Sequence, residues 1–104
     1  MKNKTLVVYS DPGHSWVKVK RSELTRLGII QNISPYSYQR SGYVYLEEDS
    51  DLGHYIDALK ENKISYVFKE FSSNRKSRIR SYELFELSDF ETTDKWRLFC
   101  ELLG

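Results

Sequence analysis

A short turn with strand-like residues on both sides is the feature that most constrains this chain. Residues 6–19 place two runs rich in Val, Tyr and Trp around the sequence Asp-Pro-Gly-His at residues 11–14. β-Branched and aromatic residues favour strands, and Asp-Pro-Gly favours a type II turn in which Gly13 takes a positive φ. The sequence therefore predicts a hairpin with Asp11 and His14 near its tip. An ordinary exposed turn, in which Asp11 only accepts hydrogen bonds from nearby amides, is the simpler interpretation.

The rest of the chain alternates between strand-like and helix-like patterns. The expected elements are a helix over residues 22–27 ended by Gly28, a hairpin of 36–39 and 43–47, a helix beginning at Asp49 or Ser50 and ending near Asn62, and strands over 64–71 and 77–87. With the first hairpin, they predict an α+β fold in the order β-β-α-β-β-α-β-β. This is a small antiparallel sheet of about six strands with the helices on one face and a C-terminal helix.

The length of the chain bounds its domain organisation. A chain of 104 residues fits one domain and leaves no room for a second core. We therefore assign residues 1–87 to a single α+β domain and residues 88–104 to a C-terminal helical extension.

Composition excludes several classes of protein. Hydrophobic residues make up 39% of the chain and aromatic residues 14%, which argues against disorder. The single Cys100 cannot form an internal disulfide and suits a reducing cytoplasm. No run approaches the ~20 apolar residues of a membrane span. We therefore expect a cytoplasmic protein that has no membrane partner and no cofactor.

Charge is distributed in blocks, although the formal net charge is only +1. Residues 1–46 and 62–80 each carry a net charge of +5, whereas residues 47–61 carry −5 and residues 81–104 carry −4. A basic and an acidic surface on one small protein would suit binding to a partner or self-association. Pairing of the blocks with each other inside the fold is the alternative.

Basic residues cluster at the last predicted hairpin, and tyrosines populate the earlier strands. The candidate binding residues of this group are Tyr36, Tyr38, Arg40, Tyr43, Arg75, Lys76, Arg78 and Arg80. We expect Arg78 and Arg80 on one face of their strand. Aromatic rings with arginines at the edge of a sheet can stack bases and hold phosphates. Alternatively, the rings form the core and the arginines are only a solvated surface.

Candidates for catalysis are few. His14 and His54 leave fewer than the three protein ligands typical of catalytic zinc, so no metal site and no catalytic residue are predicted. The carboxylates of residues 47–51 can bind a divalent cation but lack EF-hand spacing. The Asp-Pro-Gly-His turn resembles a motif of zinc-dependent N-acetylmuramoyl-L-alanine amidases, whose later Ser-x-His element has no counterpart in this sequence. A metal-dependent hydrolase at Asp11 and His14 is therefore kept only as a second alternative.

The C-terminal segment has apolar residues on more than one side of its expected helix. A capping box at residues 88–91 begins the helix, and Trp96, Phe99 and Leu103 share one of its faces. Such a helix must be covered by the sheet or by a partner chain. We therefore predict Trp96, Phe99 and Leu103 as the interface of a homo-oligomer.

Short motifs are spread over residues 5–82. They are Tyr-Ser-Asp-Pro-Gly-His-x-Trp at residues 9–16, Tyr-Ser-Tyr-Gln at 36–39, Tyr-Leu-Glu-Glu-Asp at 45–49 and Ser-Arg-Ile-Arg at 77–80. In this combination they resemble a family of small uncharacterised proteins encoded by bacteriophages, plasmids and bacteria. The resemblance implies a mobile-element accessory protein that acts by stoichiometric binding, in the host bacterial cytoplasm if it is encoded by a phage.

The leading hypothesis is a small non-enzymatic binding protein that binds a host protein or sequesters a nucleotide, in host takeover or anti-defence. Its binding surface would combine Asp11, His14 and Trp16 with the tyrosines and arginines of the hairpins. A single-stranded nucleic-acid-binding protein that uses the same residues is the first alternative.

Overall fold

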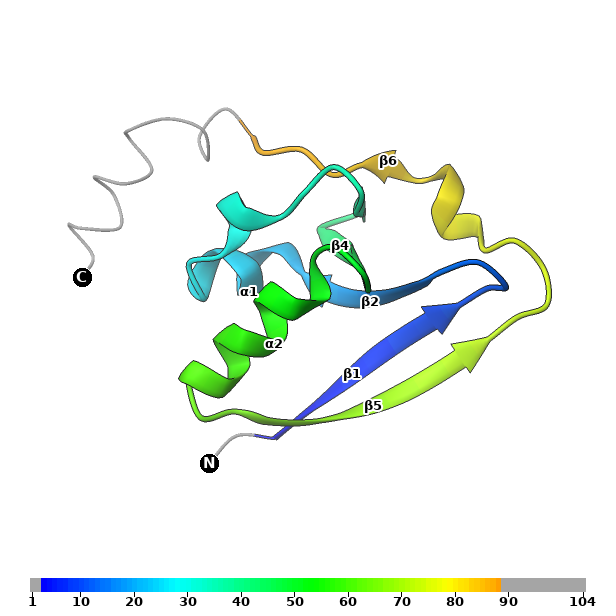
Figure 1. The fold of residues 1–104 in the computed structure, drawn as a ribbon. Coiled ribbons are helices and arrows are strands. Elements are labelled where there is room, and N and C mark those ends of the chain that lie inside the picture. The colour runs from blue at the N-terminus through cyan, green and yellow to red at the C-terminus, as the bar shows by residue number, and fades with distance from the viewer. Residues whose placement is uncertain (1–2, 89–104) are drawn as a thin grey trace.

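The elements of the fold follow the predicted order. The computed structural model describes residues 3–88 (Figure 1). In chain order the elements are β1 (Asn3–Ser10), β2 (Ser15–Lys20), α1 (Arg21–Arg26), the 3-10 helix η1 (Ile30–Asn32), β3 (Tyr38–Arg40), β4 (Tyr43–Glu47), α2 (Leu52–Glu61), β5 (Ser65–Ser72), the 3-10 helix η2 (Arg78–Ser81) and β6 (Glu83–Leu84). The predicted α+β class is confirmed.

The six strands form one sheet in the order β5-β1-β2-β4-β3-β6. All neighbours are antiparallel except β5, which runs parallel to β1 from the pair Asn3–Ser65 to the pair Ser10–Ser72. The predicted antiparallel sheet of about six strands is confirmed for four of the five strand pairs, and the edge pair of β5 with β1 is the exception. The reason is that α2 returns the chain to the end of the sheet where β4 began, so β5 has to run parallel to β4 and β1.

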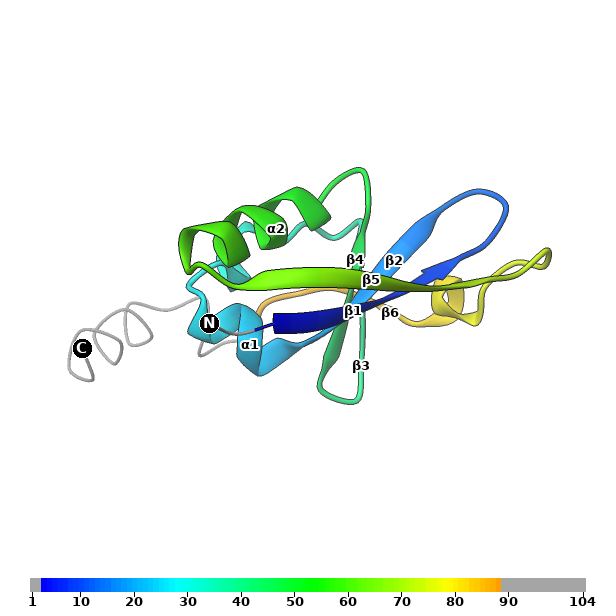
Figure 2. The same cartoon turned by 90° about the horizontal axis from the view of Figure 1, so that it is seen from below.

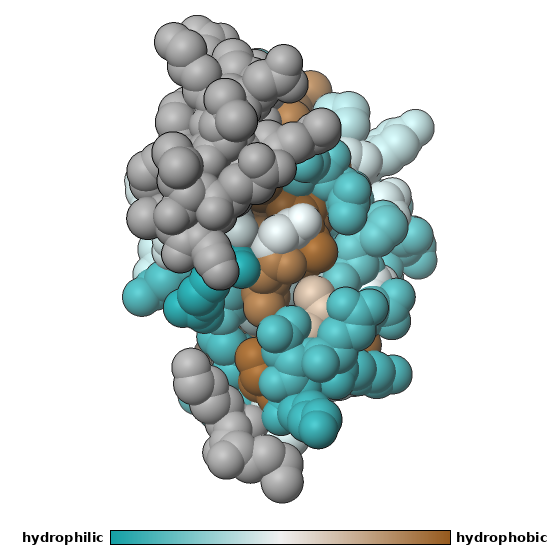
Figure 3. Space-filling model, turned by 90° about the vertical axis from the view of Figure 1, so that its left-hand side faces the viewer, coloured by the Kyte–Doolittle hydropathy of each residue, from teal (hydrophilic) through white to brown (hydrophobic). Residues whose placement is uncertain are grey.

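Strand alternation divides the side chains between two faces of the sheet. Val17 and Val19 of β2 face the helices and share a core with Leu24 of α1 and with Tyr55 and Leu59 of α2. Figure 2 shows α2 lying along this face. Figure 3 shows hydrophobic residues reaching the surface in a central strip between hydrophilic ones, at the end of the molecule on the left of Figure 1. The predicted placement of the helices on one face is confirmed.

The opposite face of the sheet carries an aromatic cluster. Trp16 and Tyr45 are buried there together with Ile79, which comes from η2. Four partly buried tyrosines pack against them: Tyr9, Tyr38, Tyr43 and Tyr82. Segment 77–82 therefore covers a face of the sheet that has no α-helix over it among residues 3–88.

Local turn signals are confirmed at two places and wrong at a third. Ser41 and Gly42 both have positive φ, as the hairpin between β3 and β4 requires, and Gly28 ends α1 with a φ of 76°. The β1–β2 hairpin forms, but Gly13 has no positive φ, so the turn is not type II. The Asp11 side chain bonds the amides of Gly13 and His14 and thereby fixes a different turn.

The predicted strand over residues 77–87 is wrong over most of its length. Ser77 is the N-cap of η2, where its Oγ accepts a hydrogen bond from the Ile79 amide at 3.2 Å, and only Glu83–Leu84 pair with β3. Ile79 is buried against the aromatic cluster and Arg78 is exposed, whereas Arg80 turns toward Asp11, so the segment does not alternate between two faces as a strand would. Tyr36 likewise precedes β3 instead of belonging to it.

Some expectations fall outside residues 3–88. They are the capping box at 88–91, the helix that follows it, and the interface residues Trp96, Phe99 and Leu103. Within the described range, neither α-helix has the length and hydropathy needed to cross a bilayer.

Candidate functional site

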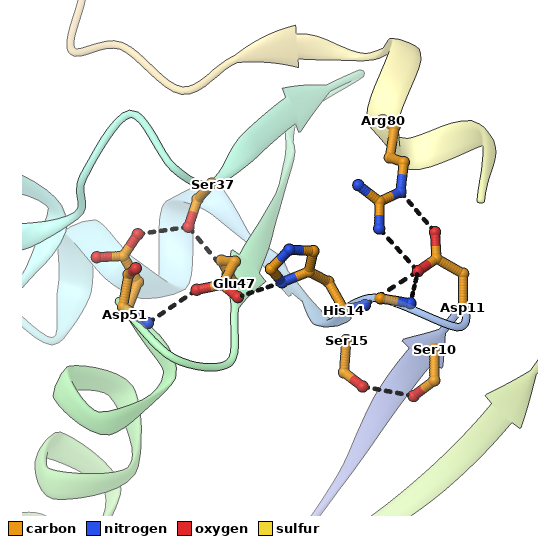
Figure 4. A network of polar contacts seen from close by, with 10 residues as sticks. Ser10, Asp11, His14, Ser15, Ser37, Glu47, Asp51 and Arg80 are labelled. Atoms are coloured by element: carbon orange, nitrogen blue, oxygen red, sulfur yellow. Dashed lines mark hydrogen bonds and ion pairs between the residues drawn. The ribbon is translucent and has the colours of Figure 1, made fainter. Parts of the chain in front are cut away.

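Asp11 ties the β1–β2 turn to η2. Its Oδ1 accepts hydrogen bonds from the amides of Gly13 and His14 (Figure 4). Its Oδ2 accepts one from the Ser77 amide at 2.9 Å. Arg80 donates to both oxygens, from Nε at 2.6 Å and from Nη2 at 2.9 Å. The Arg80 bonds, aided by the amides and opposed by burial, hold the pKa of Asp11 far below its usual range. Asp11 therefore acts as an anchor between two distant segments.

Arg80 also lies close to Trp16 and to Gly13. Its guanidinium lies 5.2 Å from the centre of the Trp16 ring, and a Cβ added to Gly13 would come within 2.7 Å of its Nη2. A side chain at position 13 would therefore push the Arg80 guanidinium away from its position on Asp11. The Asp11 partner raises the pKa of Arg80, which stays charged. Because its charge is balanced by Asp11 and two of its N–H groups donate there, Arg80 positions η2 and is a poor candidate for holding a ligand.

A second polar network begins at His14. Its Nδ1 lies 3.1 Å from Oε1 of Glu47, whose Oε2 accepts a hydrogen bond from the Ser50 amide at 2.9 Å (Figure 4). The Glu47 amide donates to Ser37 Oγ at 3.0 Å, and Ser37 Oγ donates to Oδ2 of Asp51 at 2.5 Å. Glu47, Ser37 and Asp51 are buried, while His14 is exposed. The network fixes the β4–α2 connection beside the first turn.

A cleft of about 610 Å³ opens on the sheet face opposite the helices. Its floor comes from β1, β2 and β4, and its walls come from the end of β5 and the segment that leads into η2. The lining residues are Tyr9, Ser10, Lys18, Tyr45, Phe71, Ser72, Ser73, Arg75, Lys76, Ser77, Arg78, Ile79 and Tyr82. The volume lies in the range of small-molecule sites, about 300–1,000 Å³.

Positive charge dominates the lining of this cleft. Arg75, Lys76 and Arg78 are exposed or partly exposed, and within residues 3–88 none of the three has an ion pair with a carboxylate. Lys18 lies on the floor with its Nζ 4.2 Å from the centre of the Tyr43 ring. No aspartate or glutamate is among the lining residues. The cleft therefore offers a positive potential to an anion.

Aromatic rings form the apolar part of the lining. The rings of Tyr9 and Phe71 are stacked with centres 5.8 Å apart, and those of Tyr45 and Tyr82 lie 5.1 Å apart. Burial raises the pKa of Tyr45, so its phenol stays neutral. Phe71 is 49% exposed and presents its ring at the rim. Planar groups can therefore stack next to the cationic residues.

No protein family model, curated protein or solved structure matches the chain. The family resemblance stays a prediction.

The structure places three of the predicted binding residues in the cleft and the others elsewhere. Arg75, Lys76 and Arg78 line it. The other eight lie outside the lining. Asp11 and Arg80 bind each other, His14 contacts Glu47, and Tyr36 is exposed in the loop before β3. The remaining four belong to aromatic contacts: Trp16 is 1% exposed, Tyr38 packs on Trp16, Arg40 lies over Tyr82, and Tyr43 lies under Lys18. The expectation that Arg78 and Arg80 share a strand face is wrong because both belong to a 3-10 helix.

The sequence interpretation missed the aromatic lining. Tyr9, Tyr45, Phe71 and Tyr82 lie far apart in the chain and meet only through strand pairing and the return of η2 over the sheet. The alternation of Tyr9 with Val8, and of Tyr45 with Leu46, could have placed both tyrosines on the face opposite the helices. Nothing local indicated that Phe71 would lie beside Tyr9.

Proposed function

We propose that the protein is a small non-enzymatic binding protein whose cleft takes a nucleotide. One observation carries the proposal: four aromatic rings and four cationic side chains line a single cleft that contains no carboxylate. A nucleotide combines a planar base, which stacks on aromatic rings, with phosphates, which bind arginine and lysine. A purely apolar ligand would leave the cationic side chains unused.

The phosphates would bind along the segment that leads into η2. Arg75, Lys76 and Arg78 supply charge there, and the hydroxyls of Ser72 and Ser73 lie in the same wall. None of the three cations has an ion pair to give up among residues 3–88, so their attraction to an anion is undiminished. Each hydrogen bond to a charged phosphate contributes about 1.5–3 kcal/mol.

The base would stack at the rim, where Phe71 is exposed beside Tyr9. Stacking of a base on an aromatic side chain contributes about 1–3 kcal/mol. A matched control lies on the same strand: Phe68 is 53% exposed but faces the opposite side of the sheet, where it pairs with Leu6.

Calorimetric titration with ATP and GTP tests the base half of the proposal. We expect saturable binding by the wild type, and the Phe71→Ala variant should bind about 5- to 150-fold more weakly because the stacking contact is lost. Phe68→Ala should bind like the wild type. Equal weakening by both variants would refute stacking at Phe71.

Removing positive charge from the cleft tests the proposed binding of the phosphates. The variant Arg75→Ala, Lys76→Ala, Arg78→Ala should lose binding without unfolding, because none of the three side chains is buried. Arg80 is left in place because it anchors η2 to Asp11. Lys60→Ala, an exposed cation of α2, is the control. Undiminished ATP binding by the triple variant would contradict the proposal.

Single-stranded nucleic acid is the second candidate ligand. Lys69 and Val67 are exposed on the same face of β5 as Phe71, so a basic and an apolar side chain continue the surface of the cleft along the strand. An oligonucleotide of ten thymidines tests this candidate. It should displace ATP, with an affinity that falls steeply with salt, if the site is a segment of a longer nucleic-acid surface.

The biological role belongs to the same proposal. The motif at residues 9–16 resembles small phage, plasmid and bacterial proteins, and a nucleotide binder of this size would act by sequestration in the host cytoplasm. The alternative of blocking a host protein also acts by stoichiometric binding. The concave cationic cleft favours the nucleotide, because protein interfaces are flatter and deplete lysine at their centre.

A further inference from the structure

We propose that His14, Glu47 and Asp49 form a binding site for a divalent transition-metal ion, of which Zn²⁺ and Mn²⁺ are the test cases. The inference is independent of nucleotide binding. Potential ligand atoms of the three side chains all lie within 4.8 Å of one another. The imidazole comes from the β1–β2 turn, and the carboxylates come from the end of β4 and the residues that follow it. One imidazole nitrogen and two carboxylate oxygens are a donor set that suits Zn²⁺ and Mn²⁺.

Charge balance points to a cation at this place. Glu47 is only 6% exposed, and a buried carboxylate is unfavourable unless hydrogen-bond donors or a positive charge compensate it. Three other carboxylates that are held inside the fold are compensated: Glu23 by Lys4 and Arg26, Asp11 by Arg80, and Asp51 by three hydrogen bonds from Ser34 and Ser37. Among residues 3–88, the Glu47 carboxylate has only one donor besides His14, the Ser50 amide. Across residues 3–88, no lysine or arginine pairs with Glu47 or Asp49, and the only basic group in contact with them is the imidazole of His14.

The surroundings orient two of the three ligands. The Ser50 amide holds Oε2 of Glu47, which leaves Oε1 directed at His14. The backbone of Glu47 is fixed through Ser37, and the backbone of His14 is fixed by Asp11. Hydrogen bonds of this kind from outer residues orient metal ligands in known sites. Asp49 is exposed and is the ligand that completes the site.

The three side chains need to move only a short distance to coordinate one ion. Ligand atoms around tetrahedral zinc lie about 3.3 Å apart, since Zn–N and Zn–O distances are about 2.0–2.1 Å. The exposed His14 and Asp49 can close the difference from 4.8 Å, while Glu47 stays in place. Three protein ligands leave one position for water or for an oxygen of a ligand.

The test is calorimetric titration of the full chain, without a histidine tag and without nucleotide, with ZnCl₂ and with MnCl₂. We expect one ion per chain. His14→Ala and Asp49→Asn should each weaken binding at least tenfold, and both are safe for folding because their side chains are exposed. The matched controls are His54→Ala and Asp57→Asn, which remove the same groups from the surface of α2 and should bind like the wild type.

Three outcomes would overturn the inference: neither ion binds stoichiometrically, the controls lose as much affinity as the site variants, or Mg²⁺ and Ca²⁺ displace the ion at equal concentration. If both proposals hold, Phe71→Ala binds the metal ion like the wild type and binds ATP more weakly. Failure of one proposal is therefore distinguishable from failure of the other.

Discussion

Replacing Ser37 by alanine removes the central hydroxyl of the buried network that positions Glu47. Ser37 is fully buried and its Oγ has two roles: it accepts a hydrogen bond from the Glu47 amide at 3.0 Å and donates one to Asp51 at 2.5 Å. The substitution would leave the Glu47 amide without that acceptor. The Asp51 carboxylate would keep two of its three donors, the amide and hydroxyl of Ser34.

The magnitude follows from these two losses. A buried donor without a partner costs about 1–3 kcal/mol, and a hydrogen bond to a charged group contributes about 1.5–3 kcal/mol. The Ser37→Ala variant should therefore lose about 3–5 kcal/mol of the free energy of unfolding. Domains of this size have only about 5–15 kcal/mol in total, and each kcal/mol corresponds to about 4–8 °C in Tm. A fall in Tm of at least about 10 °C is expected.

Urea denaturation followed by far-ultraviolet circular dichroism measures this loss. The matched control is Ser50→Ala, in which a nearby exposed serine is shortened while its amide still donates to Glu47. The control should stay within about 0.5 kcal/mol of the wild type, as surface substitutions usually do. A loss below about 1 kcal/mol for Ser37→Ala would refute the interpretation that the network stabilises the β4–α2 connection.

Three further predictions test other parts of the structure. Burial raises the pKa of Glu23, but Lys4, Tyr55 and Arg26 outweigh burial and hold it below its ordinary value of 4.5. The ionised Glu23 therefore stabilises the fold above pH 4.5, and this contribution is lost as the pH falls through the lowered pKa. The difference in free energy of unfolding between the wild type and Glu23→Gln should become smaller on acidification. A constant difference would count against the ion pairs. Lys63, which follows α2, has a φ of 56°, so Lys63→Gly should raise the free energy of unfolding, measured by urea denaturation, by up to about 1 kcal/mol. A lower free energy of unfolding would show that the left-handed backbone costs nothing at this position. If residues 96–103 form an oligomer interface, the variant Trp96→Glu, Phe99→Glu should have a lower mass in light scattering, and an unchanged mass would argue against that interface.

Features set by neighbouring residues could be predicted from the sequence. The β3–β4 hairpin follows from Ser41-Gly42, whose positive φ values fit a two-residue turn, and the end of α1 follows from Gly28. The helix α2 follows from apolar residues at helical spacing. In each case the deciding interactions span a few residues, so the local pattern was sufficient.

Features set by distant residues could not be predicted in this way. Asp11 bonds Ser77 and Arg80, and these contacts turn a strand-like segment into a 3-10 helix. The parallel pairing of β5 with β1 brings Phe71 beside Tyr9 and so creates the aromatic lining of the cleft. No local signal separates this pairing from an antiparallel one.

In the candidate sites, too, local features could be predicted from the sequence and features that depend on distant residues could not. Charge alone singled out Arg75, Lys76 and Arg78, and these residues line the cleft. Counting histidines predicted no metal site, whereas the metal site proposed above depends on Glu47 lying 3.1 Å from His14 across 33 positions, which the sequence does not show. A ligand set assembled from two segments becomes visible only after the strands are paired.

Titration of the ¹⁵N-labelled protein with ATP, followed by NMR chemical shifts of the backbone amides, tests the central proposal most directly. Saturable shifts are expected at Tyr9, at residues 71–73 and at Ile79, all of which line the cleft, and these shifts should disappear in the variant Arg75→Ala, Lys76→Ala, Arg78→Ala. The absence of saturable shifts, or shifts confined to α2 on the opposite face, would contradict nucleotide binding in the cleft.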